Sequence, residues 1–179
     1  MHSFLSRLNA LLAFSLSIVA LLTLVFALST SYKSYEKLAN IDMQIVKSLV
    51  RKMPDYNMPN AIENDLGLVQ FNLDGHFEDC FDWNVKQLFI YLTANYRTES
   101  NILNQVVLWD YILNRGEKGQ LTLRNQHPEY YMWDDGFGLR GNNNVTLTLS
   151  MNIIPNAGFL QTAISPTTHT FSFPQDYLT

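Results

Sequence analysis

The side chains that could perform covalent or metal chemistry are few in this sequence. Cys80 is the single cysteine, which excludes an internal disulfide, a cysteine-rich zinc site and a Cys-x-x-Cys redox pair. No reactive-site motif surrounds it, and a free cysteine often behaves as a small buried hydrophobe. The four histidines, His2, His76, His127 and His169, show no spacing typical of a metal site. We therefore expect no metal or other cofactor, and structural roles for these five residues.

Two alternative sites would use carboxylates. His76 and Asp79, with a serine, would supply a hydrolase triad, but the sequence lacks a Gly-x-Ser-x-Gly turn for the nucleophile. Because a triad is defined by geometry and not by chain order, this alternative stays open. The acidic runs at residues 78–82 and 134–135 could bind calcium, yet neither matches the D-x-[DN]-x-[DN]-G loop. We expect solvated loop carboxylates in both runs.

The three tryptophans, Trp83, Trp109 and Trp133, offer a third possibility. Exposed indoles in a row would form a platform on which a ligand stacks. Tryptophans within strands are more often core residues whose N–H is hydrogen-bonded at one edge, and we expect this arrangement. The residues alone therefore indicate no enzyme.

Composition limits the class of protein further. The chain has 179 residues, about one domain, with 12 Lys+Arg against 16 Asp+Glu and a formal charge of -4. This balance argues against nucleic acid as a partner, because phosphate-backbone binding needs a basic patch or stripe. Charged residues make up 16% of the chain, below the roughly 25% of ordinary soluble domains. The deficit is local, since no charged side chain lies between Arg7 and Lys33.

Residues 10–28 are apolar apart from two serines and one threonine. As a helix they would span about 28 Å, close to the hydrocarbon thickness of a bilayer. A cleavable signal peptide is the alternative, with Ala27 and Ser29 as a small-residue cleavage site, but its apolar core would be shorter. A buried helix of a soluble protein is disfavoured because the segment is apolar all round. An uncleaved signal anchor fits best.

The orientation of this anchor is weakly encoded. Arg7 precedes it, and Lys33 and Lys37 follow it, so the positive-inside rule gives a nearly balanced count. Asn144, in Asn-Val-Thr, is the acceptor of the only glycosylation sequon of the chain. A sequon that is used must reach the secretory lumen, which favours a lumenal C-terminal domain.

Period-2 alternation dominates the remaining chain and predicts an antiparallel β-sandwich of seven or eight short strands. The alternating segments are 41–45, 69–73, 145–153 and 170–173, the denser apolar runs are 88–92 and 106–109, and 121–123 is a shorter strand. The dense runs are typical of central strands buried on both faces. We expect Asp74 and Gly75 to kink or interrupt the early strand, and residues 51–65 to be the least ordered stretch. No long amphipathic helix follows the anchor.

Several segments resemble one known family, the third subunit of the eukaryotic signal peptidase complex. The segments are 81–92 (FDWNVKQLFIYL), 104–110 (NQVVLWD), 143–150 (NNVTLTLS), 152–158 (NIIPNAG) and 5–9 (LSRLN), the last just before the apolar span. They occur in the family's order along nearly the whole chain, and least is recognisable in residues 34–65.

This resemblance implies a single-pass type II protein of the endoplasmic reticulum membrane. It implies a short cytosolic arm at residues 1–10, a transmembrane signal-anchor helix at 11–30 and a lumenal β-sandwich domain at 31–179. The implied role is that of a non-catalytic accessory subunit in signal-peptide removal, which stabilises a separate catalytic chain and helps to shape substrate access. Its partners would be that catalytic subunit, the other subunits of the complex, the membrane and, indirectly, nascent secretory precursors.

The family's glycosylation site carries over to Asn144. Strand parity agrees with this independently, because Val145, Leu147 and Leu149 point one way and leave Asn144 and Thr146 on the opposite, polar face.

Two other classes remain as alternatives. An anchored or secreted β-sandwich that binds a ligand such as a glycan is compatible with the same fold. An enzyme is the third possibility, and would require the isolated chain to hydrolyse a substrate and to depend on Cys80 or a histidine.

Overall fold

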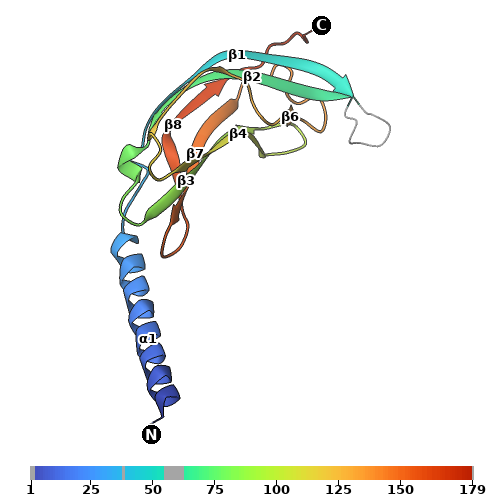
Figure 1. Ribbon diagram of the computed structural model, residues 1–179. Helices are drawn as coiled ribbons and strands as arrows, with labels where there is room; N and C mark the ends of the chain where they lie inside the picture. Colours follow the sequence, from blue (N-terminus) through green and yellow to red (C-terminus); the bar gives the residue numbers. More distant parts are fainter. Residues whose placement is uncertain (1–2, 38, 55–62, 179) are drawn as a thin grey trace.

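A computed structural model describes residues 3–37, 39–54 and 63–178. A long N-terminal helix, α1 (Phe4–Thr30), projects from one end of an elongated β-domain, and the C-terminus lies toward the opposite end (Figure 1). In the described part of the chain, eight strands form two four-stranded antiparallel sheets. The predicted fold class, mainly β with one apolar N-terminal helix, is confirmed.

The helix α1 is long and apolar enough to cross a membrane, and this makes it a candidate span. It begins at the N-cap Ser3, whose hydroxyl accepts a hydrogen bond from the Ser6 N–H at 3.3 Å. The hydroxyls of Ser17 and Thr23 donate to the carbonyls of Ala13 and Val19 one turn earlier, at 2.9 and 2.8 Å. Two of the three hydroxyls within the apolar run are thus satisfied inside the helix, as a hydrocarbon environment favours.

The first sheet contains β1 (Asn40–Pro54), β2 (Glu63–His76) and β5 (Gln120–Gln126) in that order, and β6 (Met132–Trp133) also pairs with β2. Both β1 and β2 are longer than their alternating cores predicted. Residues 51–54 and 63–65, expected within the least ordered stretch, are paired strand residues. The rest of that stretch, 55–62, lies outside the described residues.

The expected interruption at Asp74 and Gly75 is wrong, because β2 continues through both. Gly75 pairs with Ile41 of β1 and with Leu121 of β5. A Cβ at Gly75 would lie 2.4 Å from Cε2 of Phe77, so the glycine makes room for this buried ring. Close packing, and not a turn, explains the glycine here.

The second sheet has the order β4 (Asn104–Asn114), β3 (Val85–Tyr96), β7 (Val145–Pro155) and β8 (Gln161–Phe171). The central position of β3 agrees with its dense apolar run. The similar expectation for residues 106–109 is wrong, because β4 is an edge strand on which Val107 is exposed. Most of β8 lies outside the predicted segment at 170–173.

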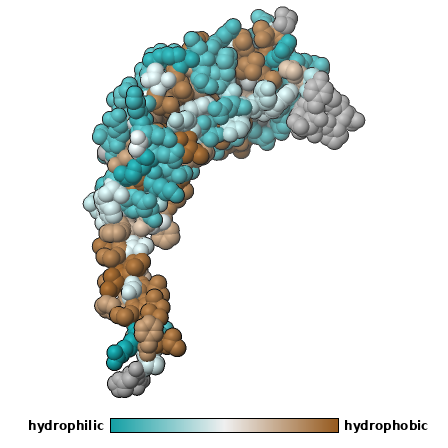
Figure 2. All heavy atoms as spheres, viewed as in Figure 1, coloured by the Kyte–Doolittle hydropathy of each residue, from teal (hydrophilic) through white to brown (hydrophobic). Residues whose placement is uncertain are grey.

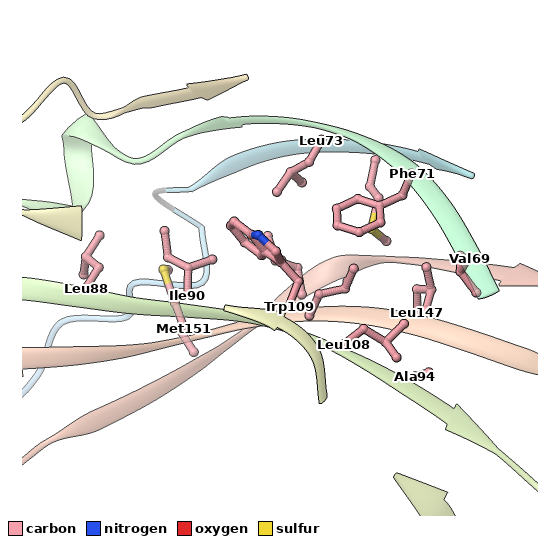
Figure 3. Close-up of a cluster of buried hydrophobic side chains, with 14 of the residues drawn as sticks. Val69, Phe71, Leu73, Leu88, Ile90, Ala94, Leu108, Trp109, Leu147 and Met151 are labelled. Carbon is pink, nitrogen blue, oxygen red and sulfur yellow. The ribbon is translucent and has the colours of Figure 1, made fainter. Parts of the chain in front are cut away.

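The core lies between the two sheets (Figure 3). Phe71 and Leu73 of β2 face Ile90 of β3 and Trp109 of β4, all nearly inaccessible to solvent. The Trp109 indole packs edge-on against Phe71, with ring centroids 6.4 Å apart. Each fully buried large side chain contributes about 1.5–3 kcal/mol. The β-sandwich predicted from alternation is confirmed, as is Trp109 as a core tryptophan.

Candidate functional site

The point where α1 meets the β-domain is the most densely bonded polar region near the helix. It is called the helix–domain junction here and comprises Thr30, Lys33, Tyr35, Asp82, Asn84, Arg115 and the β7–β8 loop at residues 156–160. It joins the C-terminal end of α1 to the turn before β3 and to the loop after β7.

Asn84 ties the last residue of the helix to the sandwich. It is 2% exposed, and its side-chain amide donates to the Thr30 hydroxyl at 2.8 Å and to the Ala157 carbonyl at 2.9 Å. Its side-chain oxygen accepts from the Ala157 N–H at 3.0 Å. Both N–H groups and the oxygen of this buried amide are therefore hydrogen-bonded. They fix the end of α1, the turn before β3 and the β7–β8 loop relative to one another.

Asp82 is the electrostatic centre of the junction. One carboxylate oxygen accepts from Lys33 Nζ and from the Tyr35 hydroxyl, each at 2.8 Å. The other accepts from the Asn84 N–H at 2.8 Å and the Val85 N–H at 3.2 Å. Burial acts to raise the pKa of Asp82, but these hydrogen bonds outweigh it and hold that pKa below its usual value.

The partners of Asp82 stay in their donating forms. Burial, followed by the hydrogen bond to Asp82, raises the pKa of Tyr35, so its hydroxyl keeps its proton at physiological pH. Lys33 and Tyr35 lie in the segment that links α1 to β1, so Asp82 holds this linker against the turn before β3.

Arg115 completes the junction from the end of β4. Its Nε donates to the Val85 carbonyl at 2.8 Å, and its Nη2 donates to the Asp82 carbonyl. The guanidinium also lies 6.0 Å from the centroid of the Phe81 ring, within the range of a cation–π contact.

The β7–β8 loop closes on the helix itself. Gly158 has φ +112°, and a Cβ there would lie 3.3 Å from Cβ of Ala27, so both its backbone angle and its close approach favour glycine. A cleft of about 360 Å³ remains between the loop and the last turns of α1, lined in part by Leu24, Leu28 and Ile153.

Large apolar side chains surround the junction on the outside. Trp83 is 53% exposed and packs edge-on against Phe26 of α1, with ring centroids 5.1 Å apart. The expectation that Trp83 belongs to the core is therefore wrong, because it lies in the turn before β3 and faces the helix. Tyr32, Phe159 and Leu160 are exposed as well. Trp133, in β6, is half-buried.

The expectation of solvated loop carboxylates is wrong at two positions, the half-buried Asp82 and the buried Asp134. Asp82 is held as described, and Asp134 is 4% exposed and accepts from the Tyr96 hydroxyl at 2.9 Å and the Gly138 N–H at 2.8 Å. Glu78, Asp79 and Asp135 are exposed as expected. Across residues 3–37, 39–54 and 63–178, no three His, Cys, Asp or Glu side chains come close enough to hold a metal ion.

The candidate nucleophile is buried in an apolar environment. Cys80 is inaccessible to solvent, and burial, followed by the nearby Asp79 carboxylate, raises the pKa of its thiol to about 12. Reactive cysteines need the opposite shift, because the thiolate is the nucleophile. Among the histidines, His76 and His127 are exposed, and His169 is half-buried and its Nε2 finds no hydrogen-bond partner within the described residues. His2 lies outside those residues.

Asn144 lies directly before β7 and is exposed. The alternating burial of Val145, Leu147 and Leu149 places their side chains in the core, and the Thr146 hydroxyl meets that of Thr170 at 3.2 Å on the other face. The side chain of Asn144 is thus accessible to a large modification.

The fold and the junction define a class: an antiparallel β-domain fastened at one end to a single apolar helix. Comparison with known proteins narrows this class. A family described as "Signal peptidase subunit" matches residues 1–176. The chain is 49% identical to signal peptidase complex subunit 3 of Drosophila melanogaster over 179 residues, which is 100% of this chain and 98% of that protein. It is 42% identical to the Homo sapiens protein of the same name over 177 residues, 99% and 97% of the two chains. This chain belongs to the signal peptidase subunit family.

Sequence reasoning missed the helix–domain junction. In the sequence, Asp82 was only one of several expected loop carboxylates and Asn84 carried no signal of its own. Their partners Lys33 and Thr30 lie about fifty positions earlier in the chain. No local pattern predicts such a contact. The one available signal was that Asp82 and Asn84 fall within the segment at 81–92 that carries the family resemblance.

Proposed function

We propose that this chain is an accessory subunit of the endoplasmic reticulum signal peptidase complex and is anchored by α1 as a single-pass type II protein. Residues 1–10 would form the cytosolic arm, 11–30 the membrane span and 31–179 the lumenal domain. The observation that carries the proposal is the full-length match to the signal peptidase subunit family. The apolar helix contacts the β-domain near its C-terminal end and is exposed along most of its length, which fits the proposed span.

The proposed role is to support catalysis that takes place on another chain. The β-domain would stabilise the catalytic subunit and help to shape the access of signal-peptide substrates. Because the junction holds the domain firmly at the end of the helix, the domain stays near the membrane surface, where tethering raises its effective concentration for a membrane-bound partner. Nascent precursors would be indirect partners.

A first experiment tests the assembly. The tagged full-length chain is purified from membranes in mild detergent, its co-purifying chains are identified, and the eluate is assayed for cleavage of a signal-bearing precursor. We expect cleavage activity together with a separate peptidase chain. A chain that elutes alone and inactive across several detergents would contradict the proposal.

A second experiment tests the orientation through Asn144, the proposed glycosylation site. With the domain in the lumen, we expect Asn144 to carry a glycan. Endoglycosidase should remove this glycan and increase the electrophoretic mobility of the chain. Asn144→Gln should abolish this shift, because it removes the acceptor, whereas Thr146→Ser keeps the sequon and should retain it. The control is a variant with a second sequon introduced after Phe173. If the second sequon is glycosylated and Asn144 is not, the domain is lumenal and only the use of Asn144 is contradicted. A chain unmodified at both sites would contradict the lumenal orientation.

A further inference from the structure

The β7–β8 loop presents two large apolar side chains at its tip, and both are exposed for more than half of their surface. Phe159 is 93% exposed and Leu160 is 56% exposed. This tip lies beside the C-terminal end of α1, where the loop hangs from the β-domain toward the helix (Figure 1). The apolar surface of α1 continues up to this end of the β-domain (Figure 2).

The expected depth of the loop tip in the membrane follows from the contact between the loop and α1. Gly158, the residue before Phe159, would place a Cβ 3.3 Å from Ala27. Ala27 is the second-to-last residue of the apolar run at 10–28, whose length of about 28 Å matches the hydrocarbon core of a bilayer. If α1 spans the membrane, the tip is therefore level with the boundary between hydrocarbon and headgroups.

The surrounding side chains are those that this boundary favours. Trp83 and Tyr32, both more than half exposed, lie at the same end of α1, and Trp83 contacts Phe26 directly. Tryptophan and tyrosine are enriched where hydrocarbon meets headgroups, because their rings are apolar and carry one polar group. The cleft between α1 and the loop lies at this level, has a volume of about 360 Å³ and is lined in part by Leu24, Leu28 and Ile153, so its lining would suit an apolar chain.

The loop is also held in place. The Asn156 N–H donates to the Asn84 carbonyl at 2.7 Å, and the Ala157 N–H donates to the Asn84 side chain at 3.0 Å. A fixed loop presents Phe159 and Leu160 without an ordering cost at the moment of contact.

We propose that Phe159 and Leu160, flanked by Trp83 and Tyr32, insert into the lipid interface beside α1 and form a second membrane contact of this chain. A single helix leaves a domain free to tilt, whereas a helix and an inserted tip together fix its orientation above the membrane. The partner is phospholipid, because the tip is continuous with a helix whose apolar side chains are exposed on every face over most of its length. This inference rests on the membrane span in the proposed function and goes beyond it.

The test places a fluorescent thiol-reactive probe at Phe159→Cys in the full-length chain, reconstituted into bilayer nanodiscs. The bilayers contain phosphatidylcholine brominated near the headgroup end of its acyl chains, which quenches fluorophores at that depth. Native Cys80 does not compete for the label because it is inaccessible, and the unmodified chain reports any background. Leu160→Cys provides a second, independent position at the tip.

Two further positions calibrate the result. Leu16→Cys, near the middle of α1, is measured in parallel bilayers whose lipid is brominated near the ends of its acyl chains, and reports whether the helix spans the bilayer. Ile102→Cys is the matched control, since Ile102 is 78% exposed in the loop between β3 and β4 at the opposite end of the domain. We expect loss of emission at Phe159→Cys, Leu160→Cys and Leu16→Cys, and none at Ile102→Cys.

Emission at both tip positions as bright as at Ile102→Cys, with Leu16→Cys quenched, would overturn the inserted tip while leaving the membrane span intact. An unquenched Leu16→Cys would overturn the span itself. Quenching at the tip that persists when the labelled chain is assembled into the intact complex supports lipid as the partner. Quenching that disappears on assembly would place a protein there and overturn the proposal.

Discussion

At each end of the β-domain one carboxylate accepts several hydrogen bonds, but the donors differ between the two ends. At the helix–domain junction, Asp82 is held by the Lys33 ammonium, a tyrosine hydroxyl and backbone N–H groups. At the far end, Asp65 is held by the Tyr177 hydroxyl at 2.9 Å and by the N–H groups of Leu139 and Arg140 at 3.1 and 2.9 Å. The far end has hydroxyl and backbone donors, and the junction adds a charged one.

This difference relates to what each carboxylate must hold. Asp65 joins segments of the β-domain itself, which the core already holds in place. Asp82 joins the domain to the linker that leads to α1, a helix that contacts the sandwich only through its last turns in the described structure. The charged Lys33 therefore strengthens a connection to which the helix itself contributes little apolar burial.

The largest expected effect separates these two carboxylates. Asp82→Asn would leave the partly buried Lys33 ammonium unpaired and should destabilise the chain by about 3 kcal/mol. Asp65→Asn keeps an oxygen for two N–H groups and strands no charge, so it should cost about 1–2 kcal/mol. Denaturant unfolding of the full-length chain in detergent measures both. Equal costs would show that the charged partner of Asp82 adds nothing.

A smaller effect is expected from the glycine that contacts α1. Gly158→Ala should cost about 1–2 kcal/mol, because alanine is strained at φ +112° and its Cβ crowds Ala27. Gly116 is the matched control, since its φ is +92° with open space around it, and Gly116→Ala should cost about 1 kcal/mol from backbone strain alone. The same unfolding measurement compares the variants. A cost at Gly158 no greater than at Gly116 would mean that the contact with the helix is unimportant.

The smallest effect is expected in mild acid, because the lowered pKa of Asp82 keeps most of this carboxylate ionised there. Since the pKa of Asp82 is lowered in the folded chain, its contribution is present above the ordinary value of 3.8 and is lost as the pH falls through the lower folded-state value. The stability advantage of the native chain over Asp82→Asn should therefore shrink below about pH 4. Unfolding midpoints across the acid range would show this, and an advantage that grows in acid would contradict it.

Alternation in the sequence predicted the sandwich well, because it reports burial on one face of each strand. Alternation was misleading in two strands, one with few apolar residues and one with apolar residues that face solvent. In β8, Pro166 and the threonines around it interrupt the apolar signal, although Ala163 and Phe171 still face inward. At the edge strand β4, outward apolar residues such as Val107 imitate a strand buried on both faces.

The site was less predictable than the fold. A carboxylate in a turn has the same sequence signature whether it is solvated, like Asp135, or held by several donors, like Asp134. The partners come from distant segments, so only the folded chain reveals them. Trp83 was misplaced for the same reason, since its neighbour Phe26 belongs to the helix and not to the sandwich.

The central claim is that this chain supports signal-peptide cleavage carried out by another chain. The most direct measurement depletes it from cells and follows both the cleavage of a secretory precursor and the abundance of the catalytic peptidase subunit, with the native chain re-supplied as the control. We predict that uncleaved precursor accumulates and the catalytic subunit declines, and that the re-supplied chain restores both. Unchanged cleavage and unchanged abundance of the catalytic subunit after depletion would contradict the claim.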